Sequence, residues 1–142
     1  MINRLTHVTV LVENLDEALQ WYTAVLGLKK KTDLILGNGY RWVTVGPEHQ
    51  QDVKIILQEP DPQFHGEVGA QLLLNKVGQG PAWVFETDDC RKTYETLKSR
   101  NVTFLSPVEE TEWGYQTVFL DLYGNQFVLV EPLPSQKASD SP

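Results

Sequence analysis

The chain has 142 residues, and its 19 acidic against 12 basic side chains give a formal net charge of −7. This length is typical of a single domain with its own core. A content of 41% hydrophobic and 22% charged residues is the balance of a soluble globular protein rather than a disordered or fibrous one. The acidic charge argues against a nucleic-acid partner, because nucleic acids are bound by basic surfaces.

The chain has one cysteine, Cys90, which excludes an intramolecular disulfide and a multi-cysteine metal site. Nowhere do about 18 apolar residues run together, as a membrane-spanning helix requires. We therefore expect a cytoplasmic protein with no membrane partner.

The first half of the sequence predicts one helix and four strands. Asn14 followed by Glu17 resembles a capping box at a helix start, and Gly27 supplies a left-handed stop. Apolar residues recur between them at three- and four-residue spacing, as on a buried helix face. The segment Gly37-Asn38-Gly39 between two β-prone runs is typical of a hairpin. Strands are expected at 5–12, 28–36, 40–45 and 53–58.

The second half repeats the order β-α-β-β-β. Asp88 is the expected N-cap of a helix with Cys90, Tyr94 and Leu97 on its buried face. Strands are expected at 81–87, 102–108, 115–120 and 126–130. Residues 59–80, rich in Pro, Gly and polar residues, predict a loop that acts as a lid, a linker or both. The polar tail, 133–142, is expected to be disordered.

The two halves also align residue by residue, which favours a duplicated module. A shift of 75 places Glu13 on Asp88 and the first apolar helix face on the second. A shift of 72 places 56–60 on 128–132, two segments that share the ending Glu-Pro. The three-residue difference falls in the hairpin at 46–52.

Three features together carry a resemblance: His7 in the opening strand, Asp16-Glu17-Ala18 near the helix start, and the closing segment GNQFVLVEP at 124–132. A tandem β-α-β-β-β repeat with these features resembles the vicinal oxygen chelate (VOC) superfamily, which includes glyoxalases, bleomycin resistance proteins and extradiol dioxygenases. The resemblance implies an α+β fold in which two βαβββ modules form a curled, cup-shaped mixed β-sheet with the helices outside. It covers a single domain, 4–132, made of modules 4–58 and 81–132 joined by loop 59–80. It also implies a homodimer.

Metal-dependent members of the superfamily carry their ligands on the first and fourth strands of each module. The resemblance maps these positions onto His7, Ile56, Ala82 and Val128. Only His7 has a side chain that can bind a metal, whereas a catalytic site generally needs three protein ligands. We therefore expect no metal and no cofactor. A rearranged site that uses Gln58, Glu59 and Glu131 stays open as an alternative.

Strand alternation predicts which residues line the cup. The expected lining is His7, Thr9, Leu11, Tyr40, Trp42, Thr44, Lys54, Ile56, Gln58, Ala82, Val84, Glu86, Tyr115, Thr117, Phe119, Gln126, Val128 and Val130. The opposite faces are almost wholly apolar and are expected to pack under the helices. From these sets and a neighbouring turn we select as ligand-binding candidates His7, Tyr40, Trp42, Gln58, Trp113, Tyr115 and Thr117, with Phe64 as a lid residue.

A cup with aromatic walls and a few polar groups is typical of a small-molecule site. The function we expect is a glyoxalase/bleomycin-resistance-like protein that binds a small amphipathic or aromatic molecule without a metal. The alternative is a metal-dependent glyoxalase-like lyase or isomerase, or a dioxygenase, with a rearranged site. Metal-free acid–base chemistry by His7 with Glu86 or Gln58 is a third possibility. The sequence assigns no catalytic residue and identifies no ligand.

Overall fold

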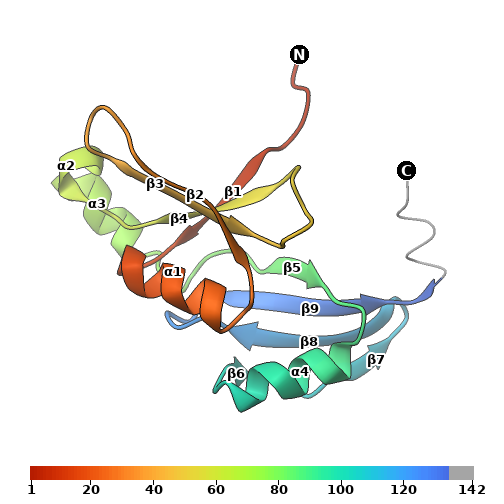
Figure 1. Ribbon diagram of the computed structural model, residues 1–142. Helices are drawn as coiled ribbons and strands as arrows, with labels where there is room; N and C mark the ends of the chain where they lie inside the picture. The colour runs from red at the N-terminus through yellow and green to blue at the C-terminus, as the bar shows by residue number, and fades with distance from the viewer. Residues whose placement is uncertain (135–142) are drawn as a thin grey trace. The chain divides into compact units, whose positions relative to one another are not determined.

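A computed structural model describes residues 1–134 of the chain (Figure 1). The chain divides between residues 80 and 81 into two compact units, each with its own β-sheet. The predicted disordered tail lies, from residue 135 onward, outside the described residues. No helix within residues 1–134 combines the length and the apolar character that crossing a bilayer requires.

The first unit has the order β1 (His7–Leu11), α1 (Leu15–Ala24), β2 (Lys29–Ile35), β3 (Arg41–Gly46) and β4 (Lys54–Gln58). Its four-stranded sheet has the spatial order β1-β4-β3-β2, with β1 parallel to β4 and the other pairs antiparallel. Two short helices follow, α2 (Pro62–His65) and α3 (Glu67–Leu74). The predicted β-α-β-β-β order of the first module is confirmed.

The second unit repeats this plan with one additional strand, β7, in the order β5 (Trp83–Glu86), α4 (Cys90–Ser99), β6 (Thr103–Phe104), β7 (Glu109–Thr111), β8 (Gly114–Leu120) and β9 (Gln126–Pro132). The strand order is β5-β9-β8-β6, with β5 parallel to β9 and with β7 paired to β8. The predicted α+β class with two tandem modules is therefore confirmed.

In the first unit the apolar face of the sheet packs against α1, which contacts β2, β3 and β4. The fully or nearly fully buried residues of this layer are Val10, Val12, Leu15, Ala18, Tyr22, Val43, Val45, Ile55 and Leu57. Asn14 caps α1 as predicted, since its side-chain oxygen accepts the N–H of Glu17 at 2.8 Å. The helix is thus held over the sheet by a continuous apolar layer and a capped start.

Each module joins the end of its last long strand to the start of its helix through a glutamate. The carboxylate of Glu59, just after β4, accepts the N–H of Leu15 at 2.9 Å, and that of Glu131, in β9, accepts the N–H of Cys90 at 2.9 Å. The repeated Glu-Pro segment therefore has a physical role, because a carboxylate satisfies an orphan N–H and complements the positive end of a helix.

The segment 59–80 is not the irregular loop that the sequence predicted. Asp61 caps α2 by accepting the N–H of Gln63 at 2.8 Å, and Pro62 occupies the first helical turn. Both residues are favoured at those positions. Helix α2 has only four residues, too few to show an apolar periodicity. Its N-cap was therefore the one sequence signal available for this helix.

The second unit departs from the predicted elements at two places. The cap of α4 is Asp89 rather than Asp88, since the Asp89 carboxylate accepts the N–H of Lys92 at 3.0 Å. The predicted strand at 102–108 is shortened to β6, and β7 was missed because two of its three residues are glutamates, which are depleted in strands.

Candidate functional site

Four of the seven predicted ligand-binding residues come together in the first unit. Strand pairing places His7 beside Lys54 and Leu11 beside Gln58. It also aligns Thr9 with Ile56, Ile56 with Thr44, and Trp42 with Leu34. We call this side of the sheet the His7 face. It comprises His7, Thr9, Leu11, Leu34, Trp42, Thr44, Lys54, Ile56 and Gln58. Tyr40 lies just before β3, two residues from Trp42, and is counted with this face. The predicted face of the first module is therefore confirmed.

His7 and Trp42 contact each other on this face. Their ring centroids are 5.5 Å apart, and the planes are inclined by 64° in an edge-to-face arrangement. The Nδ1 atom of His7 also lies 2.9 Å from the hydroxyl of Thr6. Both rings are half-buried, so they present a partly accessible aromatic surface.

Helix α2 adds two residues that the sequence placed in a loop. The ring of Phe64 lies 5.2 Å from that of Tyr40, edge to face, and the ring of His65 lies 6.5 Å from it. Phe64 was predicted as a lid residue, whereas His65 was given no role. The ring of Tyr40, just before β3, thus forms one aromatic cluster with the two rings on α2.

The His65 ring is held at both nitrogens. Its Nδ1 atom accepts the backbone N–H of Asp61 at 3.0 Å, and its Nε2 atom lies 3.0 Å from the side-chain amide of Gln58. Because a neutral imidazole carries one proton and Nδ1 is an acceptor here, Nε2 carries that proton. The Gln58 atom at this distance is its amide nitrogen, and a half-turn of the amide would bring its oxygen there to accept the proton.

Tyr40 is linked to the same amide. Burial raises the pKa of the Tyr40 phenol, and side-chain hydrogen bonding with Gln58 opposes this effect. The phenol therefore stays protonated at neutral pH and can donate a hydrogen bond.

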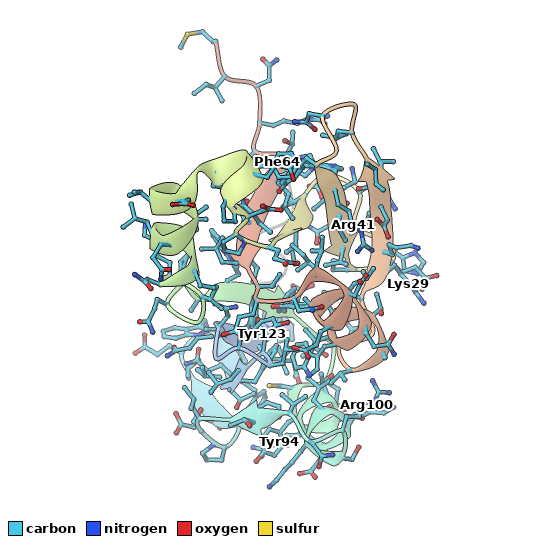
Figure 2. All side chains as sticks on the ribbon, turned by 90° about the vertical axis from the view of Figure 1, so that its left-hand side faces the viewer. Lys29, Arg41, Phe64, Tyr94, Arg100 and Tyr123 are labelled. Atoms are coloured by element: carbon cyan, nitrogen blue, oxygen red, sulfur yellow. The ribbon has the colours of Figure 1, made fainter. Side chains whose placement is uncertain are left out.

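A pocket of about 350 Å³ lies at the end of the sheet beside Tyr40. Its lining is Asn14, Leu15, Asp16, Gly39, Tyr40, Arg41, Glu59, Asp61 and Phe64. These residues come from the start of α1, the start of β3 and the segment that leads into α2. Figure 2 shows Arg41 on β3 and Phe64 at α2. The Tyr40 and Phe64 rings thus form the apolar part of a mostly polar wall.

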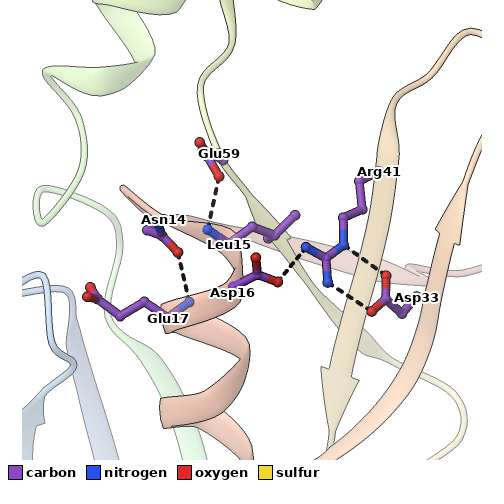
Figure 3. Close-up of polar contacts among 7 residues, drawn as sticks. All are labelled: Asn14, Leu15, Asp16, Glu17, Asp33, Arg41 and Glu59. Carbon is purple, nitrogen blue, oxygen red and sulfur yellow. Dashed lines mark hydrogen bonds and ion pairs between the residues drawn. The ribbon is translucent and has the colours of Figure 1, made fainter.

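Arg41 lines this pocket and donates hydrogen bonds to two carboxylates (Figure 3). Its Nε and Nη2 atoms donate to the two oxygens of Asp33 at 3.0 Å each, and Nη1 donates to Asp16 at 2.6 Å. These hydrogen bonds, Asp33 first, raise the pKa of the guanidinium, and the Arg41 hydrogen bond lowers the pKa of Asp33. The lining then carries three carboxylates, Asp16, Glu59 and Asp61, against one cation.

The residues at the superfamily's ligand positions do not fit a metal ion. Ile56, Ala82 and Val128 offer no donor atom, and within residues 1–134 no three His, Cys, Asp or Glu side chains are grouped to hold one. Two donors of the alternative rearranged site, Glu59 and Glu131, accept helix N–H groups instead.

Strand pairing corrects the predicted face of β8. Val118 pairs with Val128, whereas Thr117 pairs with Leu129 and Phe119 with Phe127. Thr117 and Phe119 are at most 1% exposed and lie on the buried side with Leu129 and Phe127. The prediction that put Tyr115, Thr117 and Phe119 on one face with Val128 was therefore wrong.

The three remaining candidates lie in the second unit. The hydroxyl of Thr117 donates to the carbonyl of Ser106 at 2.7 Å, and the guanidinium of Arg91, on α4, lies 5.5 Å from the centre of the Tyr115 ring. Trp113 is 49% exposed, and its indole N–H donates to Gln116 at 2.9 Å. Thr117 and Tyr115 thus belong to the layer beside α4, and Trp113 keeps an accessible ring.

Comparison with known proteins gives consistent family matches. The model of the Glyoxalase/Bleomycin resistance protein/Dioxygenase superfamily matches residues 4–129. The chain is 32% identical over 126 residues to the uncharacterized protein YurT of Bacillus subtilis (strain 168), covering 87% of this chain and 94% of YurT.

Solved structures have the same fold. UcmS2 has a TM-score of 0.83 at 32% identity, covering 92% of this chain and 99% of its own. A superfamily member from Sphaerobacter thermophilus DSM 20745 has a TM-score of 0.73 at 32% identity, covering 92% and 98%. TnmS3, an antibiotic binding protein from Streptomyces sp. CB03234, has a TM-score of 0.75 at 24% identity, covering 93% and 98%, a likeness that shows the fold alone.

Proposed function

Because the chain belongs to the Glyoxalase/Bleomycin resistance protein/Dioxygenase superfamily, we propose that it binds a small amphipathic or aromatic molecule without a metal ion. This fold supports several chemistries, so the side chains at the site decide between them. The observation that carries the proposal is the set of aromatic rings on the His7 face, next to a pocket of about 350 Å³.

The apolar part of the ligand rests on the rings of the His7 face. His7, Tyr40 and Trp42 present partly accessible aromatic surface, and Phe64 extends it from α2. Aromatic surfaces of this kind favour flat, conjugated molecules, because stacked or edge-to-face rings gain energy beyond the burial of apolar area. The fold shared with TnmS3, an antibiotic binding protein, is compatible with such a ligand.

The polar part of the ligand faces the pocket. Three carboxylates border it against the single guanidinium of Arg41, which is already bonded to Asp33 and Asp16. The excess negative charge favours a ligand with a positively charged end, and the overall charge of −7 adds a long-range attraction for cations. The ligand we propose is therefore a flat ring system with an ammonium-type substituent.

Metal-assisted chemistry finds no support in the donor atoms at the four superfamily ligand positions. A metal that polarises a substrate oxygen needs several protein ligands around an open position. His7 is the single donor at the four superfamily positions, and its Nδ1 atom lies beside Thr6.

Thermal-shift measurements in excess EDTA test this proposal. The probes are 1-naphthylmethylamine and its neutral counterpart, 1-naphthalenemethanol. We expect the amine to raise the melting temperature more than the alcohol, and Trp42→Ala to abolish both shifts. Trp21→Ala is the matched control, because Trp21 is also a half-buried tryptophan of the first unit but lies on α1 against Tyr22. Stabilisation by neither probe, or stabilisation that requires a divalent ion, would contradict the proposal.

The assembly is a further part of the proposal. We propose that modules 4–58 and 81–132 form one domain and that two chains pair as a homodimer in the cytoplasm, as the superfamily resemblance implies. Size-exclusion chromatography with light scattering should give twice the chain mass of 16.1 kDa. A monomer at all concentrations would refute the proposed dimer but would not contradict the proposed ligand site.

A further inference from the structure

The rings of Tyr40 and Phe64 form a corner in the lining of the pocket of about 350 Å³. Both residues line this pocket, and their ring centres are 5.2 Å apart with the planes inclined by 85°. Gly39 lines it as well and has no side chain to cover Phe64, since a Cβ at this position would lie 4.0 Å from the Phe64 ring. The pocket therefore presents two nearly perpendicular aromatic surfaces to an occupant.

Two rings in this arrangement attract one cation together. The face of an aromatic ring carries partial negative charge, and its attraction for a cation extends to about 6 Å from the ring centre. Because the centres of the Tyr40 and Phe64 rings are only 5.2 Å apart, a small cation in the corner lies within that distance of both. The corner therefore favours positive charge, as do the carboxylates that border the pocket.

The second unit contains a comparable pair that holds a cation of the protein itself. The rings of Tyr94 and Phe104 have centres 4.5 Å apart and planes inclined by 62°. The ammonium nitrogen of Lys98 lies 5.4 Å from the centre of the Tyr94 ring and 3.4 Å from its hydroxyl. A Tyr–Phe pair of this chain thus accommodates a cation beside its tyrosine.

Two of the three pocket carboxylates already use one oxygen as an acceptor within the protein. The carboxylate of Glu59 accepts the N–H of Leu15 at 2.9 Å (Figure 3). That of Asp61 accepts the N–H of Gln63 at 2.8 Å. These hydrogen bonds hold the carboxylates in place but leave their charges, which act on a cation without the alignment that a further hydrogen bond would need. The lining therefore suits a cation that does not depend on donating N–H groups.

We infer that the charged end of the ligand is a quaternary ammonium group bound between the rings of Tyr40 and Phe64. This inference rests on the proposed function and narrows its ammonium-type substituent to a fully methylated one. A primary ammonium is strongly hydrated and would lose hydrogen bonds to water beside these two half-buried rings. A trimethylammonium group has no N–H to satisfy, so its methyl groups pack on the rings while its charge is attracted by them and by the carboxylates.

The test uses three naphthalene probes that differ in one substituent. They are trimethyl(1-naphthylmethyl)ammonium, the primary amine 1-naphthylmethylamine, and the neutral 1-neopentylnaphthalene, in which carbon replaces the charged nitrogen of the first. Dissociation constants are measured for the intact chain by protein-observed NMR titration. We expect the trimethylammonium probe to bind about five- to thirtyfold more tightly than its neutral isostere, and about threefold or more tightly than the primary amine.

One substitution tests the contribution of the rings. Phe64→Leu keeps an apolar side chain but removes one ring, so it should lower the preference for the trimethylammonium probe over its neutral isostere about two- to fivefold. Phe104→Leu is the matched control, because it removes the same ring from the Tyr–Phe pair of the second unit, and it should leave the preference unchanged. The melting temperature of each variant without probe shows that it is folded.

A second substitution tests the contribution of the charge. Asp61→Asn removes one negative charge but keeps a residue that is favoured as the N-cap of α2. It should weaken the binding of both cationic probes about two- to fivefold and leave that of the neutral probe unchanged. Asp89→Asn, the same change at the N-cap of α4, should alter none of the three affinities.

The outcomes separate this inference from the proposed function. The inference is overturned if the primary amine binds as tightly as the trimethylammonium probe, if the neutral isostere does so, or if the preference survives Phe64→Leu. The comparison of amine with alcohol that tests the proposed function stands in each of these cases. Binding of none of the three probes overturns both.

A further readout needs no substitution. Intermolecular NOEs from the N-methyl protons of the bound trimethylammonium probe should reach the ring protons of Tyr40 and Phe64. NOEs to His7 and Trp42 without these two rings, or to the exposed Trp113 alone, would overturn the inference, since the charged end would then lie outside the corner.

Discussion

Arg41 connects strand β3 to both β2 and α1, and its two carboxylate partners should contribute very unequally to stability. Asp33 receives two parallel hydrogen bonds at 3.0 Å, and its side chain is 23% exposed. Asp16 receives one at 2.6 Å and is 82% exposed. A bidentate pair with one shielded partner is stronger than a single solvated contact, despite the shorter distance of the latter.

We therefore expect a coupling free energy of about 1 kcal/mol between Arg41 and Asp33, and of about 0.3 kcal/mol or less between Arg41 and Asp16. Double-mutant cycles with Arg41→Gln, Asp33→Asn and Asp16→Asn measure both, using urea unfolding at pH 7. Arg41→Lys should lose most of the Asp33 coupling, because an ammonium cannot donate in the bidentate geometry.

The pH dependence gives a second check on the same pair. The pKa of Asp33 is lowered in the folded state, chiefly by the Arg41 hydrogen bond. A lowered carboxyl pKa contributes stability that is complete above the unfolded value near 3.8 and is lost as the pH falls through the folded value. The coupling should therefore persist at pH 7 and disappear progressively below about pH 4. A larger coupling to Asp16, or an Asp33 coupling unchanged at pH 2, would refute this reasoning.

Five further substitutions, in three sets, test the packing of the modules. Gly114→Ala should lower the free energy of unfolding by about 3 kcal/mol or more, because the new Cβ would lie 2.1 Å from the carbonyl oxygen of Glu131. Gly39→Ala should lower it by only about 1 kcal/mol in thermal unfolding, because Gly39 has a positive φ but its new Cβ would have no contact under 4.0 Å. Glu59→Ala and Glu131→Ala should each cost about 1 kcal/mol through loss of the helix cap, and unequal losses would argue against a shared role. Thr117→Val should cost about 1–2 kcal/mol by leaving the carbonyl of Ser106 unsatisfied, whereas an unchanged urea midpoint would contradict this.

The sequence predicts the first module well because its signals are local. In β4 the buried Ile55 and Leu57 alternate with half-buried neighbours. In β3 the alternation is one of residue type only, since burial is continuous from Val43 to Gly46. His7, Trp42 and Gln58 share the other face for the same reason.

The face of β8 could not be predicted in this way because its phase depends on pairing. Val118 pairs with Val128 and Thr44 with Ile56. The repeat shift in this strand is therefore 74, not the 75 taken from the helices. A shift error of one residue exchanges the two faces of a strand. Thr117 added to the error, since a polar residue was expected to face a ligand but its buried hydroxyl is satisfied by Ser106.

His65 was missed because its role depends on a contact between separate elements. The four-residue helix α2 carries no periodic signal, and only the fold brings His65 to Gln58. The cap formed by Asp61 and Pro62 could have revealed the helix. The hydrogen bond to Gln58 leaves no trace in the sequence pattern.

Metal-free binding of a flat ligand on the His7 face is tested most directly by aromatic ¹H–¹³C spectra of the protein, titrated with 1-naphthylmethylamine in excess EDTA. Saturable shifts of the Trp42 and Tyr40 ring signals, with Tyr94 unmoved, are the predicted result. Ring signals that do not respond, or that respond only after Zn²⁺ or Mg²⁺ is supplied in place of the chelator, would contradict it.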